Sequence, residues 1–314
     1  MSFKSFLELV EIRTKAASII PFFLGVIYSV YRYNSFNLKN SLLMLISLLS
    51  IDMATTAINN YFDYKKANET RGYNYEEHNA IVRYGIKENT VKLTIILLLL
   101  IATLFGLLLY LNTDEVVLII GVVSFMVGIL YTFGPVPISR MPLGEIFSGF
   151  FMGFIIVFLS VYIHVFNKKM VEIILNQGIL NVEINIKEII NIFLVSIPTM
   201  NGIANIMLAN NICDIEDDVK NRRYTLPVYI GKNNAIKLFK FLYCVIYIDI
   251  IILIALRIIP VFSIAAILTG LPVAKNVKKF AEKQTKEHTF VLSIKNFVLI
   301  NSVYILTIIA GMLK

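Results

Sequence analysis

Long apolar stretches, separated by short charged segments, run along almost the whole chain. A helix that crosses a bilayer core needs about 20 apolar residues, within a range of about 17–25. The pattern therefore predicts nine membrane-spanning helices, of which the eighth is short and separated from the seventh by Arg257 alone. The predicted spans cover, in order, residues 16–31, 41–62, 92–112, 115–133, 144–166, 189–210, 238–256, 258–273 and 290–312.

The composition agrees with this pattern and excludes most other classes of protein. Hydrophobic residues make up 57% of the 314 residues and charged residues 16%, whereas ordinary globular proteins have about 45–50% and about 25%. These values exclude a disordered chain, a nucleic-acid-binding tail and almost every soluble enzyme. We therefore expect residues 1–314 to form one all-α, polytopic domain that lies in a lipid bilayer and does not bind nucleic acid.

The distribution of basic residues predicts the orientation of the helices. Most of the 29 Lys and Arg residues fall in segments that the predicted spans place on the same side of the membrane as the N-terminus. Loops rich in Lys and Arg stay cytoplasmic. The N-terminus is therefore expected on the cytoplasmic side of the cell membrane, and an odd number of spans places the C-terminus outside. Residues 2–13 are charged and amphipathic, which predicts a helix on the membrane surface.

Two similar polar clusters end the second and the sixth predicted spans, at the cytoplasmic side. Both contain Asn-Asn-x-x-Asp, and their four-span separation is typical of a parallel internal repeat. The first reads NNYFDYKK over residues 59–66 and is followed by Glu69 and Arg71; the second reads NNICDIEDD over residues 210–218 and is followed by Lys220, Arg222 and Arg223.

The spacing within these clusters indicates a metal and diphosphate site. Residues four apart lie on one helical face, so Asn59 pairs with Asp63, and Asp214 pairs with both Asn210 and Asp218. Like charges four apart weaken a helix, which indicates a cation between the last two carboxylates. Mg²⁺ is usually held by one or two carboxylates together with substrate phosphates, and the basic residues downstream suit such a polyanion. A single run of this kind is more often a solvated helix end; the paired occurrence favours a site.

These motifs resemble those of the UbiA superfamily of intramembrane aromatic prenyltransferases. The resemblance covers most of the chain and includes YTFGP at residues 131–135 and PLGE at residues 142–145. Both clusters, the segment NRRYTLPVYIG over residues 221–231 and the pair Arg13-Thr14 are most similar to the 1,4-dihydroxy-2-naphthoate prenyltransferases of menaquinone synthesis. The chain departs from the family at Asn60, where Asp is common, and at Glu69, where a further Asp is common, and this weakens the first metal position.

The resemblance implies a reaction in which an aromatic ring and a polyprenyl diphosphate form a carbon–carbon bond with Mg²⁺ as cofactor. An aromatic face stabilises a cation, and Arg13 or Arg140 suits an acceptor carboxylate. The expected catalytic residues are Asp63, Asp214, Asp218 and Tyr131. The expected metal ligands are Asn59, Asp63, Glu69, Asp214 and Asp218. The expected substrate-binding residues are Arg13, Asn59, Lys66, Arg71, Arg140, Asn210, Lys220, Arg222 and Arg223.

Two alternatives stay open at this point. The acceptor could be 4-hydroxybenzoate, homogentisate, haem or a glycerophosphate lipid, because the shape of the cavity sets this choice. A secondary transporter with buried carboxylates is the main alternative outside the family, but transporters bind near the bilayer midplane, whereas both clusters lie at its edge. Asp52 lies deeper in the second span, and we interpret it as a cavity-lining or helix-pairing residue.

Overall fold

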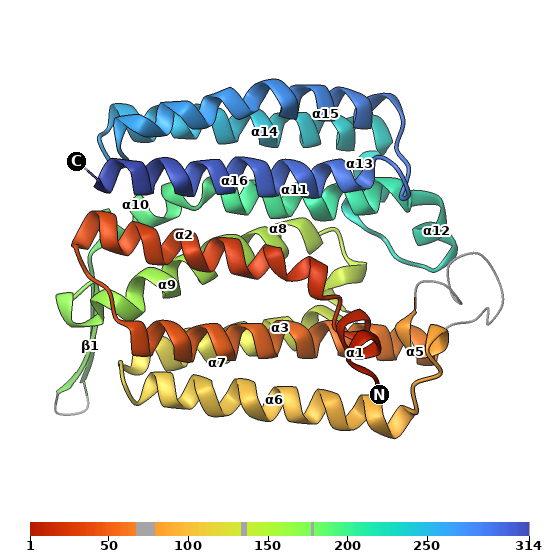
Figure 1. The fold of residues 1–314 in the computed structure, drawn as a ribbon, viewed down its shortest axis with the longest axis horizontal. Coiled ribbons are helices and arrows are strands. Elements are labelled where there is room, and N and C mark those ends of the chain that lie inside the picture. The colour runs from red at the N-terminus through yellow and green to blue at the C-terminus, as the bar shows by residue number, and fades with distance from the viewer. Residues whose placement is uncertain (67–78, 133–136, 177–178, 314) are drawn as a thin grey trace. The chain divides into compact units, whose positions relative to one another are not determined.

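The computed structural model describes residues 1–66, 79–132, 137–176 and 179–313, and helices make up most of them (Figure 1). The chain divides into two compact units. The first comprises Met1–Ile19 and Leu42–Pro135, and the second comprises Ile20–Ser41 and Val136–Lys314. The chain passes between the units within helices α2 (Ala16–Tyr33) and α3 (Leu38–Lys66), and again after Pro135.

The first unit holds the first cluster at the end of a long helix. Small residues on α3, among them Ala54 and Ala57, are fully buried, and the Ser47 hydroxyl donates to the Ala102 carbonyl of α6 at 2.7 Å. Such small and hydroxyl-bearing residues allow helices to approach closely in a membrane. The elements are α1 (Phe3–Leu9), η1 (Ile12–Lys15), the start of α2 (Ala16–Tyr33), most of α3 (Leu38–Lys66), α5 (Ala80–Arg83), α6 (Glu88–Tyr110) and α7 (Glu115–Thr132).

The second unit is built around α11, which packs against η3, α14 and α16 and carries the second cluster at its C-terminal end (Figure 1). Its elements before α11 are most of α2, the start of α3, η2 (Ile138–Arg140), α8 (Gly144–Ser148), the π-helical η3 (Gly149–Ile155), α9 (Ile156–Val165), η4 (Phe166–Lys168), β1 (Val171–Asn176), β2 (Ile179–Ile184) and α10 (Ile186–Val195). The later elements are α11 (Ile197–Cys213), α12 (Ile215–Lys220), α13 (Leu226–Ile230), α14 (Lys232–Ala255), the 3₁₀-helical η5 (Val261–Thr269), α15 (Gly270–Glu282) and α16 (Phe290–Met312).

Seven helical segments within the described residues are long and apolar enough to cross a membrane. The count becomes eight if α10 and α11, which meet at a 49° bend, form one span, and Glu115–Tyr131 is a shorter apolar helix. The bend falls at the first turn of α11, where Pro198 is the second residue, because proline cannot continue the hydrogen-bond ladder of the preceding helix. The fold is thus that of a helical membrane protein, and nine spans stay a prediction.

Three local features differ from the sequence-based expectations. The N-terminal helix ends at Leu9 instead of continuing to residue 13, because Glu11 adopts a left-handed conformation with φ of 48°. The eighth predicted span begins as a 3₁₀ helix and continues to Glu282, past its expected end at residue 273. Strands β1 and β2 form an antiparallel hairpin with Val171 opposite Ile184. A search for long apolar runs does not detect strands this short.

The π-helical segment brings two backbones into close contact. A Cβ atom on Gly153 would lie 2.4 Å from Met200 Cα, and one on Gly149 would lie 2.9 Å from the Met200 carbonyl oxygen. The Thr199 hydroxyl donates to the Gly153 carbonyl at 2.9 Å. Glycines four apart permit this approach between membrane helices, and here they fix α11, which carries the second cluster.

Replacing Gly153 by alanine is therefore expected to destabilise the protein. The new methyl group would overlap with backbone atoms of Met200, which can shift only if the packed helices move. Overpacking of this kind costs about 1–3 kcal/mol. Thermal unfolding in detergent micelles measures the effect. Gly121→Ala on α7 is the matched control, since no heavy atom lies within 4 Å of the added Cβ there. Equal unfolding temperatures for the two variants would contradict the packing argument.

Candidate active site

The second cluster lies where α11 breaks and the chain turns into the short helix α12. Asp214 ends α11 with φ of −103° and ψ of 9°, outside the helical region. The backbone N–H of Asp218 still donates to the Asp214 carbonyl at 2.8 Å. The two aspartates are therefore one turn apart in spite of the break.

A lysine from a distant loop contacts the start of this cluster. Lys286 lies between α15 and α16, and its Nζ donates to Asn210 Oδ1 at 2.6 Å. The same ammonium forms an ion pair with Asp214 Oδ2. Asn210 and Asp214 thus direct their oxygens towards one point, as residues one turn apart on a helical face can, and a positive charge occupies that point.

Asp218 has its own close partners, Thr225 and Arg223. Only 3% of it is exposed, and Oδ2 accepts a hydrogen bond from the Thr225 hydroxyl at 3.0 Å. Arg223 Nε lies 3.4 Å from Asp218 Oδ1. Arg222 has a left-handed φ of 54°, and this turn brings Arg223 back against the carboxylate. Burial raises the pKa of Asp218, and the Arg223 charge opposes that rise.

The segment before α8 joins the same site through backbone and side-chain contacts. The Tyr224 N–H donates to the Arg140 carbonyl at 3.0 Å, which places the η2 segment beside α12 and α13. The Asn211 amide donates to Glu145 Oε1 at 2.9 Å. Glu145 is buried, and its Oε2 has no hydrogen-bond partner among the described residues. Lys220 is exposed and pairs with Asp217 at 3.4 Å.

In the first unit, Asn59 is half-buried and Asp63 is exposed near the end of α3. Asn60, one of the two residues at which the motif departs from the family pattern, is buried and donates to the Leu9 carbonyl at 2.9 Å and to Glu11 Oε1 at 3.3 Å. A carboxylate has no proton to donate to a carbonyl. The amide thus gives this position a role in holding the N-terminal segment on α3.

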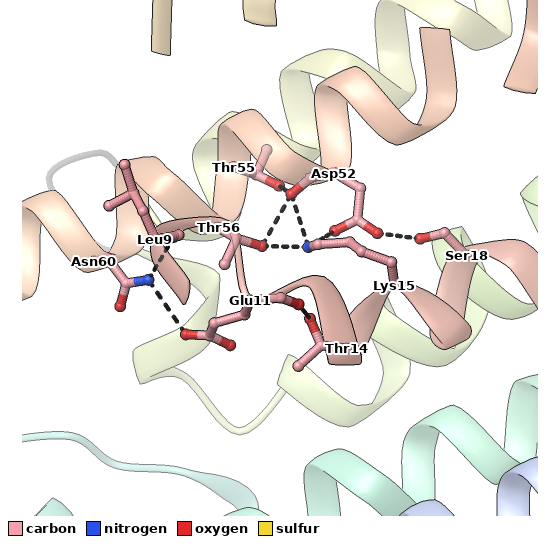
Figure 2. A network of polar contacts seen from close by, with 9 residues as sticks. All are labelled: Leu9, Glu11, Thr14, Lys15, Ser18, Asp52, Thr55, Thr56 and Asn60. Carbon is pink, nitrogen blue, oxygen red and sulfur yellow. Dashed lines mark hydrogen bonds and ion pairs between the residues drawn. The ribbon is translucent and has the colours of Figure 1, made fainter. Parts of the chain in front are cut away.

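A buried ion pair joins the same helix, α3, to the last residue of η1, just before α2 (Figure 2). Lys15 is 1% exposed, and its Nζ donates to Asp52 Oδ1 at 2.6 Å and to the Thr56 hydroxyl at 2.7 Å. The Ser18 hydroxyl donates to the other oxygen of Asp52. Asp52 therefore pairs helices, one of the two roles expected of it.

The other predicted residues have different positions. Arg13 is exposed in η1, and Tyr131 is half-buried near the end of α7, both in the first unit. Glu69, Arg71 and the side chain of Lys66 lie outside the described residues. In the described part of the chain, no three His, Cys, Asp or Glu residues form a metal-binding group. The second cluster supplies two carboxylates and an amide, a set that suits Mg²⁺ only together with phosphate or water oxygens.

Comparison with known proteins decides the family. The UbiA prenyltransferase family matches residues 18–300. A 1,4-dihydroxy-2-naphthoate octaprenyltransferase of Bacillus subtilis (strain 168) is 32% identical over 244 residues, which are 78% of this chain and 71% of that protein. The chain belongs to the UbiA prenyltransferase family. The resemblance noted from the sequence motifs is thereby confirmed, and the protein is a prenyltransferase with the apolar helices of an integral membrane protein.

Solved structures of UbiA homologues show that the prenyltransferase has their fold. One from Aeropyrum pernix K1 has a TM-score of 0.67 at 14% identity and covers 92% of this chain and 97% of its own. Another, from Archaeoglobus fulgidus and bound to DMAPP and Mg²⁺, has a TM-score of 0.64 at 15% identity. The match covers 98% of this chain and 99% of that chain.

Three side chains of this prenyltransferase were missed by sequence reasoning. Lys286 is one of several lysines in a basic loop, and nothing in its neighbourhood singles it out. Glu145 belongs to a family motif, yet its buried partner Asn211 comes from a helix that the motif does not include. Lys15 could have been found, because an acid such as Asp52 within a span requires a partner.

Proposed function

We propose that this enzyme transfers a polyprenyl group from its diphosphate to 1,4-dihydroxy-2-naphthoate, in a Mg²⁺-dependent step of menaquinone biosynthesis. The acceptor rests on one observation, the 32% identity to the Bacillus subtilis protein named for that acceptor. A homologue bound to DMAPP and Mg²⁺ supports a prenyl diphosphate donor and a divalent metal. We further propose that the chain is one domain in the cytoplasmic membrane, with its site facing the cytoplasm.

The oxygen ligands of the second cluster fit Mg²⁺. The Lys286 ammonium takes a cation position between Asn210 Oδ1 and Asp214 Oδ2, so these oxygens already converge on a positive charge. Carboxylate and amide oxygens are hard ligands, and Mg²⁺ is usually bound by one or two carboxylates together with substrate phosphates. The proposed ligands are Asn59, Asp63, Glu69, Asp214 and Asp218.

When bound, Mg²⁺ neutralises the diphosphate and makes it a better leaving group. Arg222 is exposed beside the second cluster, and we assign it with Arg223 to the phosphate oxygens, since guanidinium groups bind phosphate through paired hydrogen bonds. Lys220 adds positive charge at the same place. The remaining proposed phosphate-side residues are Asn59, Lys66, Arg71 and Asn210.

Departure of the diphosphate leaves an allylic cation that must be kept from water. The apolar helices exclude water, and we assign Tyr131 to stabilise the cation through its aromatic face. The electron-rich ring of the acceptor then attacks the cation and forms the new carbon–carbon bond. The ring becomes aromatic again by releasing a proton or, where decarboxylation accompanies the transfer, CO2. Arg13 or Arg140 is assigned to the acceptor carboxylate, because a guanidinium matches a carboxylate in a bidentate pair.

Metal removal gives a direct test. We expect purified enzyme in detergent, supplied with labelled polyprenyl diphosphate and 1,4-dihydroxy-2-naphthoate, to form prenylated product with Mg²⁺, to lose this activity with EDTA, and to regain it when Mg²⁺ is restored. Chromatography of the extracted lipid measures the product. Parallel reactions contain 4-hydroxybenzoate, homogentisate, haem or a glycerophosphate lipid. Product from one of these instead of the naphthoate would overturn the acceptor assignment and leave the reaction class intact.

A further inference from the structure

The position of Lys286 depends on a well-defined turn. The Thr285 N–H donates to the Thr289 hydroxyl at 2.8 Å, and the Phe290 N–H donates to the Thr285 carbonyl at 3.0 Å. Gln284 donates to the Phe280 carbonyl at the end of α15 at 2.6 Å. These bonds fix the loop between α15 and α16, so the fold itself directs the Lys286 side chain towards α11.

The ammonium contacts three groups at once. It bonds to Asn210 Oδ1 and to Asp214 Oδ2, and it lies 5.5 Å from the centre of the Phe290 ring. Asp214 is one of the proposed metal ligands, and the Asn210 oxygen faces the same cation position. An ammonium and a divalent cation cannot occupy the same position between the same two oxygens, so one must leave when the other binds.

The balance of charge shows why a cation is needed there when no metal is bound. Asp214 and Asp218 are one turn apart and repel each other. In the structure each has its own positive partner, Lys286 for the first and Arg223 for the second. Lys286 therefore compensates the charge that the metal would otherwise neutralise.

The exposure of the two partners shows which of them can be exchanged. In the Arg223–Asp218 pair the side chains are 36% and 5% exposed, whereas in the Lys286–Asp214 pair they are 47% and 29% exposed. Ion pairs that water reaches contribute little to stability, so release of Lys286 from Asp214 costs little free energy. Release of Arg223 costs more, because it leaves the buried Asp218 carboxylate without its cation. A flexible lysine that leaves the carboxylate remains close enough to act as a point charge for a phosphate group.

From these contacts we infer that Lys286 is a competing internal cation of the second cluster: it occupies the divalent-metal position between Asn210 and Asp214 and yields it when the metal binds. This inference rests on the proposed function, because it takes Asp214 as a metal ligand, and it adds the Asn210 oxygen to the ligands proposed above. It adds a residue from the α15–α16 loop to a site that the sequence motifs place on α3, α11 and α12. It also predicts that the lysine weakens the binding of metal alone.

The test measures the binding of Mn²⁺, a spectroscopic substitute for Mg²⁺, to the purified full-length protein in detergent without diphosphate. Electron paramagnetic resonance of free Mn²⁺ gives the dissociation constant. We expect Lys286→Met to bind Mn²⁺ about tenfold more tightly than the unaltered protein, a factor that corresponds to about 1.4 kcal/mol. Lys286→Arg keeps the positive charge and is expected to bind Mn²⁺ as the unaltered protein does.

Lys283→Met is the matched control, since Lys283 begins the same loop and its side chain is exposed. It removes one positive charge from the loop without touching the cluster. Equal tightening by Lys283→Met and Lys286→Met would show a general charge effect and overturn the inference. A second readout is the unfolding temperature, which Mg²⁺ should raise more in Lys286→Met than in the unaltered protein.

Asp214→Ala separates failure of this inference from failure of the proposed metal site. If Asp214→Ala abolishes Mn²⁺ binding and Lys286→Met leaves it unchanged, the metal site stands and the competing role of Lys286 is wrong. If Asp214→Ala also leaves Mn²⁺ binding unchanged, the second cluster is not the metal site, and both proposals fail there.

Discussion

Asp214→Ala is expected to lower the rate of prenyl transfer by at least about a hundredfold. A bound metal contributes several kcal/mol of transition-state stabilisation, and each 1.4 kcal/mol or so is a factor of ten in rate. Asp214 contributes the carboxylate that faces the cation position, opposite Asn210 Oδ1. The measurement is kcat for product formation at saturating substrates, over a range of Mg²⁺ concentrations.

Asp217→Ala is the control for this variant. It makes the same chemical change three residues along, on an exposed side chain whose only described ion pair is with Lys220 on the surface. Exposed pairs of this kind contribute about 0–1 kcal/mol. We therefore expect the activity of Asp217→Ala to lie within about twofold of that of the unaltered protein. The unfolding temperature of Asp214→Ala should stay close to that of the unaltered protein, because Asp214 also pairs with an exposed lysine. Similar losses of activity in both variants would mean that the negative charge near α12 determines the rate of prenyl transfer, and that Asp214 does not act as a metal ligand.

The predicted spacing within the second cluster survives in the structure, although the helix does not. Asn210 and Asp214 face one cation because residues four apart share a helical face, and this depends on local geometry alone. Beyond Asp214 the chain leaves α11 and turns into α12, where Asp218 contacts Thr225 and Arg223. A break of this kind depends on tertiary contacts, which spacing does not encode.

Residues that complete the site from elsewhere in the chain could not be predicted in the same way. Lys286 is 72 residues from Asp214 in the sequence, and it becomes a partner only because of the loop between α15 and α16. Glu145 meets Asn211 for the same reason, across 66 residues. The span pattern fixed the approximate location of the helices, because apolar length is a local property. It did not reveal the β1–β2 hairpin, which is too short for that criterion.

Lys15→Met is expected to destabilise the protein by about 3–5 kcal/mol, the typical cost of removing one partner from a buried ion pair. The loss leaves the Asp52 carboxylate without its cation, while only the Ser18 hydroxyl still donates to it among the contacts drawn in Figure 2. The Thr56 hydroxyl keeps its own bond to the Asp52 carbonyl at 2.9 Å, so it cannot compensate. Thermal unfolding in detergent micelles measures the change.

The double variant Lys15→Met with Asp52→Leu distinguishes a lost attraction from an unpaired charge. Replacing both partners of a buried pair by apolar residues is often neutral or stabilising, so we expect the double variant to regain most of the stability that Lys15→Met loses. If the double variant is as unstable as the single one, the ion pair itself holds the start of α2 on α3. If the double variant regains the stability, the Lys15 charge is required only to compensate the buried Asp52 carboxylate. In that case Asn60, which donates to the Leu9 carbonyl, holds the N-terminal segment without help from the pair.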